Sequence, residues 1–225
     1  MALSLYGLKE WLLATVLAAI IAAISIAIGW WWLAIVAGVL WIAAIAFFRD
    51  PLGRRPATES DQDMVSPADG RISAVERVDH HPATDGPAVI VRIFLSVLDV
   101  HVNRAPCDAT VQELVYKPGK YLDARSEESA RVNESNLIIM QRPCGTRIGV
   151  RQVSGAIARR IVCPLKSGDS LKRAQRFGMI KFGSTTELIL PDHGEQGPVV
   201  HVSKGDRVRG AVTILATAVD SNPAD

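Results

Sequence analysis

The chain has 225 residues, 48% of them hydrophobic, and a formal net charge of +2 at pH 7. This length allows one substantial domain and an appendage, and so small a charge gives no basis for a nucleic-acid partner. The chain has three cysteines, Cys107, Cys144 and Cys163, and no two of them have a short spacing. This argues against a disulfide framework or a metal site. It predicts reduced, mostly buried thiols in a cytosolic domain.

The first predicted element is an apolar segment that carries no charge from Trp11 to Phe48. As one helix it would extend about 57 Å, nearly twice the hydrocarbon core of a bilayer, which is about 30 Å thick. We therefore predict two short membrane helices, a hairpin that breaks near Gly29 to Trp32 with its tryptophans at the lipid–water interface. A hairpin that dips into one leaflet stays an open alternative. A signal peptide would have a shorter apolar region.

Two spans would place both ends of this anchor, residues 1–48, on the same side of the membrane. Arg49, Arg54 and Arg55 follow directly, and the positive-inside bias puts that side in the cytoplasm. We therefore expect the anchor to lie in the cell (inner) membrane and the remaining chain to lie on its cytoplasmic side. Residues 49–63 are polar, contain two prolines and are predicted to form a linker.

Residues 64–225 are predicted to form one β-rich domain. Short Val- and Ile-rich runs separated by Gly, Pro and Asp indicate strands at 88–97, 110–116, 136–141, 147–155, 156–163, 186–191, 199–203 and 211–219. Only 121–131 and 170–177 could form short helices. The predicted class is therefore α+β, a mostly antiparallel, β-rich soluble domain behind an N-terminal hydrophobic helical hairpin.

The stretch "VSKGDRVRG" (202–210) has two interpretations. It is typical of a plain hairpin turn at Gly205-Asp206. A strand, a Lys-Gly-Asp turn and a strand also occur in carrier-like β-sandwiches, but such a carrier presents a lysine between methionine-like neighbours at its hairpin tip, and that arrangement is absent.

The stretch "GMIKFGSTTELILP" (178–191) alternates like a strand but has Gly183 and three hydroxyl residues in its middle. These residues could form a β-bulge. The nucleophile-elbow pattern G-x-S-x-G does not fit, because Ser184 follows Gly183 directly.

A Gly-Ser pair also allows the chain to cut itself. Attack of the Ser184 hydroxyl on the Gly183 carbonyl closes a five-membered ring, and glycine leaves the approach open. The peptide would become an ester, and β-elimination would leave a dehydroalanine. Tautomerisation and hydrolysis would give a pyruvoyl group on fragment 184–225.

Two further stretches carry candidate acid/base residues. In "MVSPADGRI" (64–72), Asp69 is either a turn aspartate or a catalytic carboxylate. In "FLSVLDVHVNRAP" (94–106), His101 ends an apolar run and is either structural or catalytic.

Taken together and in this order, these motifs resemble the short, membrane-anchored phosphatidylserine decarboxylases. The likeness runs from about Phe47 to about Leu215 and includes "YKPGKYLDA", "RVNESN" and "IARRI". It implies cleavage between Gly183 and Ser184, into a β chain 1–183 and an α chain 184–225 that stay together as a heterodimer. It also implies a covalent pyruvoyl cofactor derived from Ser184.

The resemblance implies that His101 and Asp69 are the acid/base residues. Longer family members have a second histidine three positions after the first, where this chain has Arg104. The reaction implied is decarboxylation of phosphatidylserine to phosphatidylethanolamine and CO2 through a Schiff base on the pyruvoyl group. The candidate phosphate-binding residues are Arg104, Arg159 and Arg160.

Two other functional classes stay open from the sequence. One is a membrane-tethered β-sandwich that acts as a carrier or binding module. The other is a tethered serine hydrolase that uses Ser184, His101 and Asp69. Both need an uncut chain, whereas the decarboxylase needs two fragments.

Overall fold

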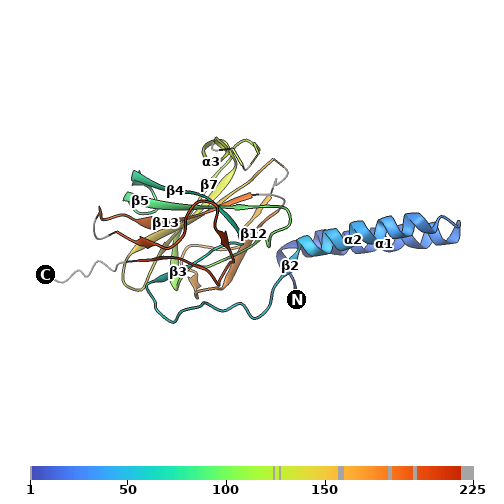
Figure 1. The fold of residues 1–225 in the computed structure, drawn as a ribbon, viewed down its shortest axis with the longest axis horizontal. Coiled ribbons are helices and arrows are strands. Elements are labelled where there is room, and N and C mark those ends of the chain that lie inside the picture. The colour runs from blue at the N-terminus through green and yellow to red at the C-terminus, as the bar shows by residue number, and fades with distance from the viewer. Residues whose placement is uncertain are drawn as a thin grey trace. The chain divides into compact units, whose positions relative to one another are not determined.

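The structure is a computed structural model that describes residues 2–123, 125–126, 128–156, 160–181, 184–194 and 197–218. The chain forms two compact units, Met1–Gly53 and Arg54–Asp225. The predicted fold class is confirmed, since an apolar helical hairpin precedes a domain of antiparallel sheets (Figure 1).

The first unit is the predicted hairpin. Helix α1 (Leu8–Ala27) follows a short 3-10 turn at Leu5–Gly7, and α2 (Trp31–Phe47) runs beside it (Figure 1). The turn between them contains Gly29, whose φ of 79° lies in the left-handed region that favours glycine. The apolar stretch Leu5–Ala27 is long enough to cross a membrane, and α2, with 17 residues, lies at the lower end of the usual range.

The two ends of the hairpin are joined at its base. Strand β1 (Ala2–Leu3) pairs antiparallel with β2 (Arg49–Asp50), and the indole Nε1 of Trp41 donates to Thr15 Oγ1 at 2.9 Å between the helices. At the base, a Cβ on Gly7 would lie 2.1 Å from the ring of Phe48. Only glycine therefore allows this close approach.

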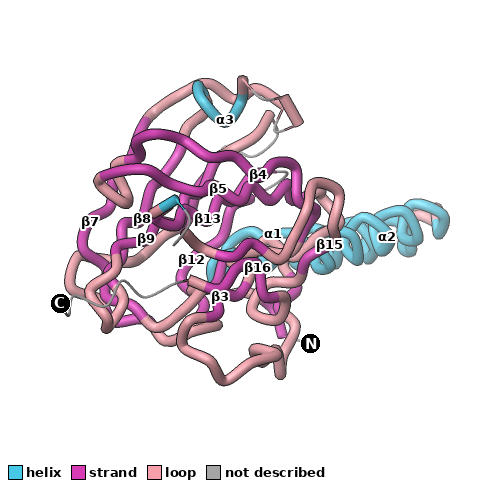
Figure 2. Tube along the Cα trace, turned by 60° about the vertical axis from the view of Figure 1, so that its left-hand side comes forward, coloured by secondary structure: helices cyan, strands magenta, loops and turns pink. Residues whose placement is uncertain are grey.

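The second unit contains three antiparallel sheets. The largest has the order β11-β7-β8-β9-β13-β5-β4-β15, and the two smaller sheets are β10-β12-β6 and β14-β16-β3. The arrangement can be followed in Figure 2. The bounds are β3 Asp63–Val65, β4 Gly70–His81, β5 Gly86–Leu95, β6 Val102–Arg104, β7 Ala109–Lys117, α3 Ser129–Val132, β8 Ser135–Gln141, β9 Arg147–Val153, β10 Arg160–Val162, β11 Ser170–Leu171, β12 Arg176–Lys181, β13 Ser184–Pro191, β14 Val199–Val200, β15 Arg207–Val208 and β16 Ile214–Thr217.

Alternation along β5 and β13 gives the large sheet an inner and an outer face. Val91, Ile93 and Leu95 of β5 and Leu188 and Leu190 of β13 belong to the main core, together with residues of the smaller sheets. Side chains two positions apart share a face of a strand. Ser184 and Thr186 therefore lie on the inner face, and Thr185 lies on the outer face.

Two sequence predictions fail in this unit. Residues 170–177 form no helix; Ser170–Leu171 pairs with β7, and β12 begins at Arg176. Segment 202–210 is no hairpin either, because β14 pairs with β16 whereas β15 pairs with β4. The turn at Lys204-Gly205 instead connects two different sheets. The possible helix at 121–131 is reduced to α3, a single turn.

Candidate active site

The end of strand β5 brings the predicted site residues to one place. Ser184, the first residue of β13, lies opposite Leu95, and Arg71 of β4 lies opposite Phe94 on the other side of β5. The Asp69-Gly70 turn and Ser184 thus flank the same strand end, about 10 Å apart by the usual strand spacing. A Cβ on Gly70 would lie 2.2 Å from the Phe94 carbonyl oxygen, so this turn requires glycine.

Ser184 is fully buried on the inner face of the large sheet. Its Oγ has no hydrogen-bond partner among the residues that the structure describes. A buried hydroxyl normally has a partner, and an exception indicates a special role. The register from Ser184 to Pro191 against β5 has no shift, so the described part of β13 contains no β-bulge. Gly183, the other residue of the predicted cleavage site, lies outside the described residues.

His101 is fully buried in the loop that joins β5 to β6. Its Nδ1 lies 2.9 Å from the Asp99 carbonyl oxygen, and a carbonyl can only accept a hydrogen bond. Nδ1 therefore carries a proton, and when the ring is neutral its basic lone pair is on Nε2. The loop is fixed at its start because Ser96 donates its amide and hydroxyl to the Asp99 carboxylate, at 2.9 and 2.7 Å.

The main chain places His101 close to the segment that leads to Ser184. The amide of Ile180, near the end of β12, donates to the His101 carbonyl at 3.3 Å. Two residues further along β6, Asn103 donates to Thr186 Oγ1 at 3.0 Å, and Thr186 shares the inner face with Ser184. These two bonds connect the segment of His101 with β12 and with the inner face of β13, two residues from Ser184.

Asp69 is nearly buried, with both carboxylate oxygens bound. Arg54 forms a bidentate ion pair with it, in which Nη2 lies 2.7 Å from Oδ2. The Gly210 amide donates to Oδ1 at 2.9 Å, and the Gly210 carbonyl accepts from Arg54 at 3.1 Å. A bidentate arginine pair holds a carboxylate in one orientation. Arg54 and Gly210 thus fix the Asp69 loop to the C-terminal part of the domain.

A chain of buried amides lies beneath the site. Asn136 Nδ2 donates to Gln152 Oε1 at 3.3 Å, and Gln152 Nε2 donates to Asn103 Oδ1 at 2.9 Å. Asn103 Nδ2 then donates to Thr186. Asn103, Gln152 and Thr186 are all fully buried. The network ties β6 to the large sheet two residues from Ser184.

We expect Asn103→Leu to destabilise the protein. It removes the partners of the Gln152 amide and the Thr186 hydroxyl, and each buried polar group left unsatisfied costs about 1–3 kcal/mol. The melting temperature in detergent, followed by intrinsic fluorescence, should fall by about 4 °C or more. Gln112→Leu, at an exposed position of β7, is the control and should melt close to the wild type. Equal melting temperatures for both variants would contradict a stabilising network.

The three candidate phosphate-binding arginines differ in their placement. Arg104 is nearly buried and donates through Nη1 to the Ala174 carbonyl at 3.1 Å, so it holds the 172–175 turn. Arg160 is exposed on β10, opposite Lys181. Arg159 lies outside the described residues. Arg160 is therefore better placed than Arg104 to meet a ligand.

The cysteines are free, but they are less uniform than predicted. Cys107 is buried, and burial raises the pKa of its thiol to about 12. Cys163 is partly buried, and Cys144 is exposed. The prediction of a buried thiol is thus correct for Cys107 and wrong for Cys144. Among the residues in the described ranges, no cluster of His, Cys, Asp or Glu could hold a metal ion.

Sequence reasoning missed several residues of the site. The sequence predicts a linker at Arg54, although this residue is the partner of Asp69. Asn103, Gln152 and Asn136 were not singled out. Each of these three amides lies in a short strand that contains other polar residues, so its burial has no local signal. No spacing rule connects Asn103 with Gln152, 49 positions apart.

Comparison with known proteins identifies close relatives. A family model described as phosphatidylserine decarboxylase matches residues 41–216. The phosphatidylserine decarboxylase proenzyme of Magnetococcus marinus is 40% identical over 196 residues, which is 86% of this chain and 86% of the relative. The proenzyme of Carboxydothermus hydrogenoformans is 42% identical over 184 residues, 82% of this chain and 84% of the relative. That of Ralstonia pickettii is 41% identical over 178 residues, 79% and 80% of the two chains.

Proposed function

The chain belongs to the phosphatidylserine decarboxylase family, and from this premise we propose that it converts phosphatidylserine to phosphatidylethanolamine and CO2 through a Schiff base on a pyruvoyl group made from Ser184. The observation that carries the proposal is the buried Oγ of Ser184 at the start of β13, which has no hydrogen-bond partner among the described residues. The matched relatives are named proenzymes, which agrees with a precursor that is processed.

The self-cleavage that we propose follows from the position of Ser184. Its Oγ attacks the carbonyl carbon of residue 183, and the peptide nitrogen leaves that carbon, so that an amide becomes an ester. Loss of the Ser184 α-proton then breaks the Cβ–Oγ bond, which releases a carboxylate at residue 183 and leaves a dehydroalanine. The dehydroalanine tautomerises to an imine. Water then hydrolyses the imine, which releases ammonia and leaves a pyruvoyl group. Chains 1–183 and 184–225 stay associated, because β13 is held between β5 and β9.

We assign His101 the proton transfers in this site. Its Nδ1–H is held by the Asp99 carbonyl, so Nε2 is the ring nitrogen that we assign as the base for the Ser184 hydroxyl. We assign Asp69 as the second acid/base residue; Arg54 and the Gly210 amide hold its carboxylate in one orientation at this strand end. Arg104 stands where longer family members have a second histidine, and its guanidinium donates to the Ala174 carbonyl. We therefore assign the proton transfers of both self-cleavage and turnover to His101.

The site fits a pyruvoyl group because that group would occupy the place of a side chain that has no other partner among the described residues. Its carbonyl supplies an electrophile for the amine of the substrate and an electron sink when CO2 leaves. The protein supplies a proton to the carbon that loses CO2, and we assign this step to His101. For the phosphate we favour Arg160, with Arg159 and Arg104 as the other candidates.

We also propose that the hairpin anchors the enzyme in the cell membrane, with the catalytic domain on the cytoplasmic side. Apolar side chains cover α1 and α2, and many of them are exposed, for example Leu13, Ile26, Ile35 and Leu40. Such a surface needs lipid or another apolar partner. A membrane anchor keeps the site near a substrate that does not leave the bilayer.

The proposal is tested by the intact mass of the purified protein. We expect two polypeptides that end at residue 183 and begin at residue 184, the second with a blocked N-terminus that resists Edman degradation. Borohydride should reduce the ketone and add the mass of two hydrogens to that fragment. One uncut chain with an ordinary serine would contradict the proposal and would favour a carrier or a serine hydrolase.

A further inference from the structure

One strand of the large sheet changes its covalent attachment if the chain is cut before Ser184. Strand β13 lies between β9 and β5, and both neighbours precede residue 183 in the chain. After the proposed cleavage, β13 is the first strand of the α chain and is held between two strands of the β chain. Its new end has the least support, because Ser184 pairs only with Leu95 of β5, and pairing with β9 begins at Thr185. Chain ends fray unless contacts hold them.

Glu187 provides such a contact three residues from this end. It is buried on the outer face of the sheet and lies directly opposite Arg92 of β5 and Arg151 of β9. Arg92 Nε donates to Glu187 Oε1 at 2.7 Å, and Arg151 Nη1 donates to Oε2 at 3.2 Å. We call these three residues the Glu187 cluster. One carboxylate of the α chain thus binds both neighbouring strands of the β chain.

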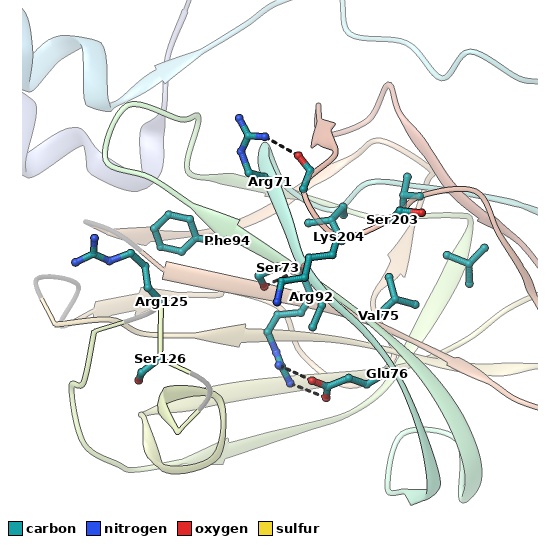
Figure 3. A pocket seen from close by; sticks show the side chains of 15 residues that line it. Arg71, Ser73, Val75, Glu76, Arg92, Phe94, Arg125, Ser126, Ser203 and Lys204 are labelled. Atoms are coloured by element: carbon teal, nitrogen blue, oxygen red, sulfur yellow. Dashed lines mark hydrogen bonds and ion pairs between the residues drawn. The ribbon is translucent and has the colours of Figure 1, made fainter.

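The two arginines of the cluster are held by further bonds. Arg92 also pairs with Glu76 of β4 at 3.0 and 3.2 Å, and Figure 3 shows these two bonds as dashed lines. Arg151 Nη2 donates to the carbonyl of Ala130 in α3. Little of either arginine side chain is exposed, 14% and 18%. Because arginines with several bonds have one orientation, the cluster gives Glu187 a fixed position between β5 and β9.

The cluster specifies how β13 lies along its neighbours. Main-chain bonds alone allow a strand to slip, and a slip by two residues keeps every side chain on its face. Such a slip would put the Glu187 carboxylate opposite Ile90 or Phe94 of β5. On β9 it would lie opposite Gly149 or Val153. An ionised carboxylate buried without a charged partner is strongly unfavourable, so the paired charges favour a single register.

We propose that Glu187 is a positioning residue for the reaction: through Arg92 and Arg151 it keeps β13 in register after cleavage, and so keeps the keto group made from Ser184 at the end of β5. The inference rests on the proposed function, because the peptide bond to residue 183 also restrains the start of β13 until the chain is cut. Glu187 lies on the other face of β13 from Ser184, so it acts through the main chain of the strand.

The first measurement is hydrogen exchange at the amides of residues 185–187 in the full chain in detergent. Glu187→Gln keeps the size of the side chain and removes its charge. In the cut protein it should raise the exchange rate of these amides by about tenfold or more. In the uncut Ser184→Ala background the same substitution should change the rate much less. Equal acceleration in both backgrounds would overturn the proposal, because the cluster would then serve the fold alone.

The second measurement is CO2 release per pyruvoyl group, with that group counted by borohydride reduction. Glu187→Gln should still cut itself, but its rate per pyruvoyl group should fall by about tenfold or more, because a misplacement of about 1 Å lowers rates by about 100-fold. A merely structural role would lower the yield of cut protein and leave the rate per pyruvoyl group unchanged, which would overturn the proposal. An uncut wild-type chain would contradict the proposed function and this inference with it.

The matched control is Asp192→Asn, which removes the same charge just after the other end of β13. Asp192 pairs at 2.7 Å with Arg77 of β4, whose side chain is exposed, and such pairs contribute little. This variant should exchange and turn over like the wild type, and effects equal to those of Glu187→Gln would overturn the proposal. Arg151→Gln leaves Glu187 with Arg92 and should show the same changes to a smaller degree. It decides the question if Glu187→Gln does not fold, and wild-type behaviour of Arg151→Gln would then overturn the proposal.

Discussion

Ser184→Ala should yield a single uncut chain without decarboxylase activity. The variant keeps the fold, because it removes a hydroxyl that has no hydrogen-bond partner among the described residues. It also removes the nucleophile of the proposed self-cleavage and the source of the pyruvoyl group. Activity should fall below detection, since no other group can supply the electrophile. The measurements are intact mass and release of labelled CO2 from carboxyl-labelled phosphatidylserine.

The control for this experiment is Ser135→Ala. Ser135, the first residue of β8, is also buried in the large sheet and lies opposite Lys117 of β7. It does not lie at the end of β5. This variant should be cut and active. If Ser184→Ala protein still decarboxylated the lipid, the pyruvoyl assignment would be wrong. If it were uncut but had a melting temperature far below that of Ser135→Ala, the loss would be one of folding.

The sequence predicted the central strands because each is a short run rich in Val and Ile. Strand β5 runs from Gly86 to Leu95 with apolar residues on both faces, and β8 and β9 are similar. Strand β4 was missed. Only two of its residues have β15 as a neighbour, and bulges after Ile72 and after Val78 interrupt the alternation of polar and apolar residues. A partly exposed, bulged edge strand lacks the period on which such predictions depend.

The wrong helix at 170–177 has a different cause. Lys172, Arg173, Ala174 and Gln175 are good helix formers, which favours a helix locally. The flanking residues Leu171 and Phe177 are instead buried in the main core and belong to strands of two different sheets. Ala174 adopts a φ of 68° in the turn between them. Tertiary burial at the two ends thus outweighs propensity in the middle.

The site was predictable only as far as local motifs extend. Ser184, His101 and Asp69 each belong to a short stretch that can be recognised, and the register of β4, β5 and β13 brings these stretches to one strand end. The partner of Asp69 is Arg54, 15 positions earlier in a polar segment without periodicity. Such a contact depends on where a loop crosses the domain, and the sequence contains no local signal for it.

His101→Ala should block self-cleavage and with it decarboxylation. Removal of a general base from a proton transfer typically lowers the rate by about 10²–10⁴-fold. The uncut chain should therefore accumulate, and its slow cleavage should accelerate as pH rises, because hydroxide replaces the missing base. Imidazole added to the variant should restore part of the cleavage by entering the space that the side chain leaves. Cleavage is followed over time on denaturing gels.

The response to imidazole distinguishes a proton-transfer role of His101 from a structural one. A histidine that only held the loop through the Asp99 carbonyl would be replaced in part by His101→Asn, which can donate to the same carbonyl but has no basic nitrogen. We expect His101→Asn to be as inactive as His101→Ala. His201→Ala, at an exposed histidine bonded to Thr217, should be cut normally. Normal cleavage of His101→Asn would assign the base to another residue. In that case the segment would contribute to the site only through the loop that Ser96 and Asp99 hold.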